Sequence, residues 1–334
     1  MSRRYIPQPV LDAAHARSAA RAAKDWATAD RLRGEIETAG WRVLDAGLDF
    51  RLEPLTPPDL EIGGEVRYGR SSSVPSRLED PAAGLATVIL IATEDPDDVQ
   101  RAIQSTKAHA PAGTQVVVVA DAPSPEVDAR LGWLSDGVEI VRTSERLGWA
   151  AALNIGLRRS RAEIIIILDT SVEPTGDFVG PLIEALVSPD VAIAGASGLG
   201  TVDLRRFNDV QGSRAAAAIE GRVMAFRRSD AVARGPIDER FRFHRNLDIW
   251  WSLVLRDEGP EGTARQAVVV GGLPLVRHPH RAWTDVPEAE RERLSKRNFY
   301  RILQRFRDRA DLAEPAAERT PGSPEVDADP ATEA

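Results

Sequence analysis

The fold is decided by the run Ile164-Ile165-Ile166-Ile167-Leu168, which is followed directly by Asp169-Thr170-Ser171. An unbroken apolar run of this length is typical of a strand that is buried on both faces of a parallel sheet. A carboxylate directly after such a strand lies at the carboxyl ends of the strands, where open α/β sheets bind their ligands. We therefore predict a buried strand over 164–168 and a binding crevice beside Asp169.

Alternating strand and helix patterns lie around this run. Predicted strands cover 85–92, 115–120 and 138–142, and predicted helices cover 96–108 and 148–160. Strands that alternate with helices are typical of βαβ units in a mostly parallel sheet. The fold class that we expect is therefore α/β.

The composition excludes several classes of protein. The chain has 334 residues, 43% of them hydrophobic, which is enough for about two domains with a substantial core. It has no cysteine, which excludes disulfides, a thiol nucleophile and a cysteine-based zinc site. No stretch has the ~20 apolar residues that a membrane-spanning helix needs, and no apolar leader follows Met1. We expect a cytoplasmic protein without a transmembrane segment.

The net charge of −8 is unevenly distributed. The last stretch, from Asp311 to Ala334, holds seven acidic residues and one arginine. The rest of the chain is therefore close to neutral, which argues against a strongly basic surface for nucleic acid.

Composition divides the chain into four parts. Residues 1–53 are predicted to form a helical hairpin, because alanine and other helix formers dominate them. Residues 54–83 are rich in proline, glycine and serine and are assigned to a linker. The α/β domain covers 84–310 and ends in a long helix over 287–309. Residues 311–334 are expected to be a disordered acidic tail.

The first part carries a family-like pattern. Residues 22–33 have the sequence Ala-Ala-Lys-Asp-Trp-Ala-Thr-Ala-Asp-Arg-Leu-Arg, and 39–45 have the sequence Ala-Gly-Trp-Arg-Val-Leu-Asp. This pattern resembles the C-terminal helical segment of cysteinyl-tRNA synthetases. The catalytic motifs and zinc-binding cysteines of that family are absent, so tRNA ligation is not implied. Two interpretations of the hairpin stay open: contact with RNA, or docking of a protein or a second copy of the chain.

A second set of motifs follows in order through 85–279. The stretches Asp121–Glu126, Ala152–Gly156, Asp169–Ser171 and Gly235–Phe241 resemble motifs of family 2 glycosyltransferases of the GT-A fold. This resemblance implies a Rossmann-like nucleotide-diphospho-sugar transferase domain with a mostly parallel sheet. It also implies transfer of a sugar from a nucleotide-diphosphate donor to an acceptor, with inversion at the anomeric carbon.

The same resemblance assigns a nucleotide site. Asp121 takes the position that holds the base, which suits a carboxylate because it can accept an N–H from a base edge. Asp169 takes the position that holds the ribose or the metal. The full set of nucleotide-binding positions is Thr93, Asp121, Ser124, Arg146, Asn154 and Asp169.

A divalent ion, Mn²⁺ or Mg²⁺, is implied beside the donor diphosphate, and such ions prefer oxygen ligands. Ser171 replaces the second aspartate of the family's Asp-x-Asp motif and supplies no charge. The candidate ligands are therefore Asp169, Glu173, His278 and His280.

The general base of the family is also replaced. Its Glu-Asp pair aligns with Arg245-Asn246, so Asp248 or Asp238 would have to take the acceptor proton. Asp248 has a second interpretation, as a negative charge that stabilises the N-terminus of its helix. These replacements leave an alternative function open: a catalytically inactive GT-A-like module that binds a nucleotide or a protein.

The long helix over 287–309 is basic and amphipathic. Such a helix is compatible with contact to an anionic membrane surface, or with packing of its apolar stripe on the domain.

Overall fold

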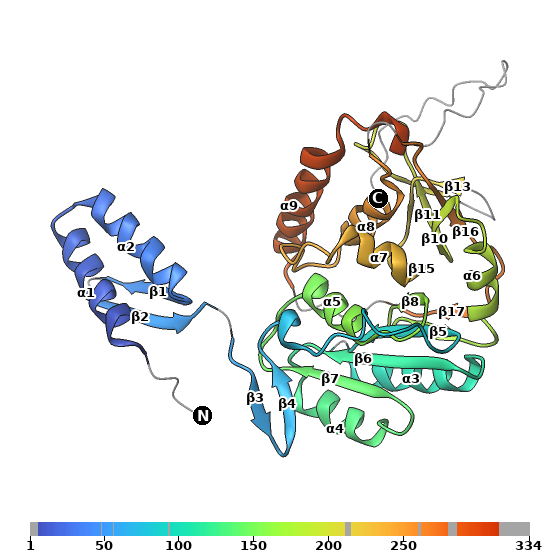
Figure 1. Ribbon diagram of the computed structural model, residues 1–334, viewed down its shortest axis with the longest axis horizontal. Helices are drawn as coiled ribbons and strands as arrows, with labels where there is room; N and C mark the ends of the chain where they lie inside the picture. The colour runs from blue at the N-terminus through green and yellow to red at the C-terminus, as the bar shows by residue number, and fades with distance from the viewer. Residues whose placement is uncertain are drawn as a thin grey trace, which may run out of the picture.

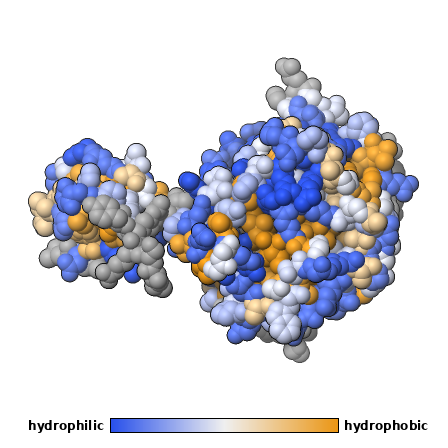
Figure 2. Space-filling model, turned by 60° about the horizontal axis from the view of Figure 1, so that its bottom comes forward, coloured by the Kyte–Doolittle hydropathy of each residue, from blue (hydrophilic) through white to orange (hydrophobic). Residues whose placement is uncertain are grey.

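The computed structural model describes residues 6–47, 49–55, 57–92, 94–210, 215–259, 262–279 and 286–313. Figure 1 shows a small N-terminal unit beside a large α/β domain, and the space-filling view shows the two as separate lobes (Figure 2).

The N-terminal unit is a helical hairpin packed on a two-stranded antiparallel sheet. Its elements are α1 (Gln8–Ala22), α2 (Trp26–Thr38), β1 (Trp41–Ala46) and β2 (Asp49–Pro54). The predicted hairpin is confirmed. Asp25 begins α2 by accepting a hydrogen bond from the N–H of Thr28 at 3.1 Å. The unit has its own core, made of Val10, Ala14, Ile36, Trp41 and Val43.

The described residues form one large sheet of ten strands. Its spatial order is β13-β16-β10-β15-β8-β5-β6-β7-β4-β3. The strands are β3 (Leu60–Ile62), β4 (Glu65–Tyr68), β5 (Ala86–Ile91), β6 (Thr114–Ala120), β7 (Glu139–Thr143), β8 (Ile164–Leu168), β10 (Val191–Gly195), β13 (Ala215–Ala216), β15 (Val223–Arg227) and β16 (Gln266–Val269). The pairs β4–β7, β7–β6, β6–β5, β5–β8 and β10–β16 are parallel. The α/β fold class is confirmed.

Helices cover both faces of this sheet (Figure 1). They are α3 (Pro96–His109), α4 (Pro125–Trp133), α5 (Trp149–Arg159), α6 (Val179–Ala185), α7 (Arg228–Arg234), α8 (Leu247–Arg256) and α9 (Glu288–Phe306), with short 3-10 turns at Ser71–Ser73 and Ala310–Leu312. The remaining short strands are β9 (Val172–Pro174), β11 (Gly198–Gly200), β12 (Asn208–Val210), β14 (Ala218–Ile219) and β17 (Leu275–Arg277).

The central strands are buried on both faces. Successive side chains of a strand point to opposite faces, so each strand contributes to two cores. In β8, Ile165 and Ile167 join the core under α5 and α8, whereas Ile166 and Leu168 join the core under α3 and α6. The predicted strand over 164–168 is therefore confirmed.

The structure differs from the linker assigned to 54–83. Residues 60–68 form the hairpin β3–β4, and β4 extends the large sheet by pairing in parallel with β7. Farther along, the side chain of Arg158 donates to the carbonyl of Val74 at 2.7 Å. The partners of this segment lie far away in sequence, so its local composition could not reveal the pairing. Residues 314–334 of the expected tail lie outside the described residues.

Helix α9 packs against the domain through its apolar stripe. Ile302 and Phe306 are buried, and the side-chain amide of Asn298 donates to the carbonyls of Phe243 at 3.0 Å and Arg245 at 2.9 Å. Across the described part of the chain, no helix has both the length and the apolar character to cross a bilayer.

Gly148 joins three parts of the domain at the start of α5. Its N–H donates to Asp121 Oδ2 at 2.8 Å, and the next N–H, of Trp149, donates to the carbonyl of Arg242 at 3.1 Å. Its φ is +101°, and an added Cβ would lie 2.8 Å from the Cα of Arg242. Both the backbone conformation and the close approach therefore require glycine here.

We predict that Gly148→Ala lowers the free energy of unfolding by about 2 kcal/mol or more, because it adds backbone strain and a clash. Gly132→Ala is the control, since Gly132 lies in α4 with nothing near its Cβ position. That variant should be neutral or stabilising by up to about 1 kcal/mol. Urea unfolding followed by circular dichroism measures both, and equal stabilities would refute the assigned role of Gly148.

Candidate active site

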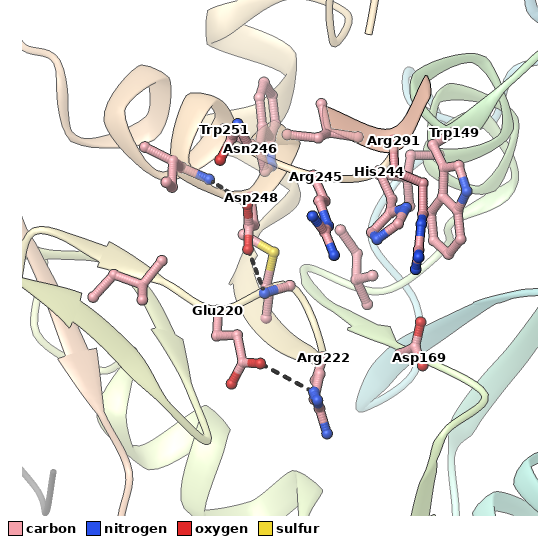
Figure 3. A pocket seen from close by; sticks show the side chains of 17 residues that line it. Trp149, Asp169, Glu220, Arg222, His244, Arg245, Asn246, Asp248, Trp251 and Arg291 are labelled. Carbon is pink, nitrogen blue, oxygen red and sulfur yellow. Dashed lines mark hydrogen bonds and ion pairs between the residues drawn. The ribbon is translucent and has the colours of Figure 1, made fainter. Parts of the chain in front are cut away.

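A cavity of about 420 Å³ opens at the carboxyl end of β8. Its walls come from the ends of β8 and β15, the N-terminal turn of α8 and the first turns of α5 and α9 (Figure 3). The lining residues are Trp149, Leu153, Ile167, Asp169, Leu199, Glu220, Gly221, Arg222, Met224, His244, Arg245, Asn246, Leu247, Asp248, Ile249, Trp251 and Arg291.

Asp169 is held at the end of the β8–β15 ladder. The antiparallel register pairs Leu168 with Val223, and beyond it the N–H of Asp169 donates to the carbonyl of Arg222 at 2.9 Å. Asp169 Oδ1 accepts from the N–H of Ser171 at 2.8 Å and from its hydroxyl at 2.5 Å. Ser171 therefore orients Asp169, and its own hydroxyl is directed at that carboxylate.

Asp248 faces the same cavity from the first turn of α8. Its Oδ2 accepts from the N–H of Gly221 at 2.9 Å, and its Oδ1 accepts from the N–H of Ile249 at 2.9 Å. Burial raises the pKa of Asp248 to about 6, and nearby Glu220 acts in the same direction. A carboxylate with this pKa is ionised at neutral pH and yet more basic than an ordinary aspartate, which suits proton abstraction.

Gly221 makes this arrangement possible. An added Cβ would lie only 3.2 Å from the Cβ of Asp248, so a larger residue would press on the carboxylate. Gly221 also lies between Glu220 and Arg222, which form an ion pair at 3.0 Å.

Basic side chains enter the cavity from a different direction. His244 and Arg245 precede α8, and Arg291 belongs to the first turns of α9. Figure 3 shows these three side chains reaching into the cavity from one side, with Asp169 and Arg222 on the other. The cavity thus combines carboxylates and cations.

Indole rings complete the wall. Trp251 is 2% exposed and packs edge-on against Phe226, with ring centroids 5.8 Å apart. Its Nε1 has no hydrogen-bond partner among the described residues. Trp149 lines the cavity from the start of α5.

Two of the predicted metal ligands, Glu173 and His278, lie side by side. Glu173 Oε2 lies 2.7 Å from His278 Nε2 and 3.8 Å from Arg101 Nε. Glu173 lines a different cavity, between α3 and β9, whereas Asp169 lines the cavity at β8. His280 lies outside the described residues. Within the described ranges, no three histidine, aspartate or glutamate side chains form a group that could hold a metal ion.

Two predicted nucleotide-binding residues make their hydrogen bonds within the protein. Asp121 Oδ1 accepts from the N–H of Leu147 at 2.8 Å and from Thr143 Oγ1 at 2.9 Å, and burial raises the pKa of this carboxyl. The buried amide of Asn154 donates to the carbonyl of Ile237 at 2.9 Å and accepts from the N–H of the same residue at 2.9 Å. Both residues hold loops around α5.

Two further predicted nucleotide-binding residues, Ser124 and Arg146, also lie outside the cavity wall. Ser124 accepts from the N–H of Val127 at 3.3 Å and thereby begins α4. Arg146 is exposed and pairs with Glu94 at 2.6 Å. Thr93 lies outside the described residues.

The alternative base, Asp238, lies in another place. Its carboxylate pairs with the guanidinium of Arg240 at 2.6 Å, which lowers the pKa of Asp238. It lines a separate groove, of about 850 Å³, beside α9. Of the predicted site residues, the cavity at β8 therefore unites Asp169 and Asp248.

Several cavity residues were not predicted as site residues. They are Trp149, Glu220, Arg222, His244, Arg245, Trp251 and Arg291. One signal in the sequence was available: Gly221 lies between two charged residues directly before an apolar run at 223–226. For Arg291, no local pattern distinguishes it from the other arginines of α9.

Comparison with known proteins supports the resemblances. A match of 51% identity over 49 residues links the chain to the cysteine–tRNA ligase of Opitutus terrae. That match covers 15% of this chain and 11% of the ligase, so it concerns a short segment only.

Two solved structures share the fold. The crystal structure of GalNAc-T7 with UDP, GalNAc and Mn²⁺ has a TM-score of 0.54 and 13% identity, and covers 66% of this chain and 48% of that one. A mannosyltransferase from Pyrobaculum calidifontis, in complex with GDP-Man and Mn²⁺, has a TM-score of 0.51 and 16% identity, over 70% and 71%. This chain thus spans about half the length of the first structure.

Residues 87–232 match the family model of glycosyl transferase family 2. The matched region contains the strands β5, β6, β7, β8 and β15, and it ends within α7. The family match over 87–232 and the architecture shared with these neighbours show a domain of the GT-A fold that resembles family 2 glycosyltransferases.

Proposed function

We propose that this chain transfers a sugar from a nucleotide-diphosphate donor to a hydroxyl of an acceptor. The observation that carries the proposal is the presence of Asp169 and Asp248 in one cavity at the carboxyl end of β8. Asp169 lies where α/β sheets bind their ligands, and Asp248 has the raised pKa of a general base.

The reaction is a single displacement. The acceptor hydroxyl gives its proton to Asp248 while its oxygen forms a bond to the anomeric carbon. The bond between that carbon and the phosphate oxygen breaks, and the nucleoside diphosphate leaves with the electron pair. Because attack and departure occur on opposite faces of the carbon, the configuration inverts.

A divalent ion does not fit the described residues. Asp169 is the one carboxylate available from the Asp-x-Asp position, and its Oδ1 already accepts two hydrogen bonds from Ser171. The expected helpers, Glu173 and His278, pair with each other. We therefore assign no step of the reaction to a metal ion, and Asp169 is proposed to accept a hydrogen bond from the donor ribose.

A second candidate function is a catalytically inactive module that binds a nucleotide or a protein. The observation that favours it is the bonding of Asp121, whose two carboxylate oxygens accept from Leu147, Thr143 and Gly148 within the protein. A carboxylate whose oxygens already accept these hydrogen bonds has fewer lone pairs free to bind the nucleobase of a donor.

For the N-terminal unit we propose a docking role. It has a core of its own and it resembles a segment of cysteinyl-tRNA synthetases. Trp26 on its surface is 60% exposed, which leaves an aromatic ring for a partner. RNA and protein stay open as alternatives for that partner.

Calorimetric titration with UDP, GDP and dTDP sugars tests the donor site. We expect one donor class to bind, and Asp169→Ala to weaken it by at least about ten-fold, because a charge-assisted hydrogen bond is lost. Absence of binding to a folded protein would remove the transferase proposal. Binding without transfer to any acceptor or to water would favour the inactive module.

Asp248→Asn tests the base. Turnover should fall by about 10²-fold or more, and donor affinity should stay within a few-fold. In the parent, turnover should rise with pH through about 6, the pKa of Asp248, and this limb should be absent from the variant. Asp238→Asn is the comparison, and an equal loss there would transfer the role to Asp238.

The thermal stability of Asp248→Asn shows whether its loss of turnover comes from unfolding. The pKa of Asp248 is higher in the folded chain than its ordinary value of 3.8, so its contribution to stability is lost as pH rises through about 6. Asp248→Asn should therefore melt at a higher temperature than the parent at pH 8, and at a similar temperature at pH 4.

The RNA alternative for the N-terminal unit makes its own prediction. Filter binding should show that the full chain retains labelled tRNA, and that a chain starting at residue 56 retains at least about ten-fold less. Charge-reversal at Arg307, an exposed residue of the large domain, is the control. If the full chain retains no tRNA, the RNA alternative is removed and the protein alternative is left.

A further inference from the structure

We infer that the cavity at β8 holds the diphosphate of its ligand with Arg245 and Arg291, supported by His244 and Arg222, in place of a divalent cation. The inference rests on the proposed function for the identity of the ligand as a nucleoside diphosphate.

Two arginines in the cavity are available to an anion. In the described part of the chain, the side chains of Arg245 and Arg291 form no ion pair with a carboxylate, and Arg291 Nε is buried without a hydrogen-bond partner. The planar guanidinium group binds phosphate oxygens through two parallel N–H donors, so two such groups match a diphosphate in charge and shape.

The carboxylates of the cavity are already engaged. Glu220 pairs with Arg222, and Asp248 accepts from the backbone N–H groups of Gly221 and Ile249. Asp169 accepts from Ser171. The carboxylates of the cavity thus have partners within the protein. Arg245 and Arg291 are therefore available to bind an anionic ligand.

The backbone adds positive potential at the same place. Leu247, Asp248 and Ile249, which line the cavity, form the first turn of α8. The helix dipole favours an anion at this end of the helix. Figure 3 shows Arg245 beside Asp248 and Arg291 beside His244, so the cations and the base face one space. An acceptor bound there is near both the base and the departing group.

This arrangement explains how transfer proceeds with a serine at position 171. As the bond from the anomeric carbon to the phosphate oxygen breaks, negative charge grows on the diphosphate. Guanidinium groups beside the diphosphate stabilise that charge in the way that a metal ion does, because both supply positive charge where negative charge develops. In the same step, Asp248 accepts the proton of the acceptor hydroxyl.

The test is calorimetric titration of the full chain with inorganic pyrophosphate and with UDP, GDP and dTDP, first in EDTA and then in manganese chloride. We expect binding in EDTA and a change of less than about three-fold with manganese. Arg245→Gln and Arg291→Gln should each weaken binding by about ten-fold or more, and the double variant should show no binding. Arg245→Lys should retain part of the affinity, since it keeps the charge.

Arg297→Gln is the matched control. It removes the same charge from α9, but Arg297 lines the separate groove beside Asp238. Its affinity should stay within about two-fold of the parent, and near-ultraviolet circular dichroism confirms that each variant is folded.

The outcomes separate this inference from the proposed function. Binding of nucleoside diphosphates that requires manganese and is unchanged in both arginine variants would overturn the inference and leave the transferase proposal intact. Arginine-dependent binding of pyrophosphate in EDTA, without binding of any nucleotide sugar, would support the anion site and remove the proposed function. No binding of any probe would overturn both.

Discussion

The antiparallel pairing of β15 with β8 is the constraint on which the candidate site depends. This ladder ends with the hydrogen bond from Asp169 to the carbonyl of Arg222, so two segments distant in sequence stop at the same point. The next residue, Gly221, donates its N–H to Asp248 and fixes the first turn of α8 there. Hydrogen bonds of two successive residues, Arg222 and Gly221, thus position Asp169 and Asp248.

Several residues of the family-like motifs form hydrogen bonds that hold loops of the protein in place. Asp121 gathers the N–H groups that lead into α5, and Asn154 holds the segment at Ile237 through both ends of its amide. A buried polar group must find partners, so each of these side chains determines where a loop lies. The walls of the cavity at β8 are built on those loops, with Trp149 as the first residue after Gly148.

The balance of charge in the cavity distinguishes this site from one built around oxygen ligands. Asp169 lies at the end of β8 and accepts from Ser171, and Asp248 lies in the first turn of α8 and accepts from Gly221. Arginines arrive from the loop before α8 and from α9. The division has a structural cause: α9 is docked by Asn298, whose amide binds the carbonyls of Phe243 and Arg245 and so brings Arg291 close to that loop.

The sequence by itself determined the α/β class, the buried strand at 164–168, the helical hairpin and the position of Asp169 at a strand end. These features follow from short-range patterns, because apolar runs, periodicity and helix formers act through neighbouring residues. Tertiary structure alone decided that β3–β4 joins the sheet, that Glu173 pairs with His278, and that Arg291 enters the cavity. Each of these depends on strand pairing or helix docking between distant segments, and no local pattern encodes which side chains such contacts bring together.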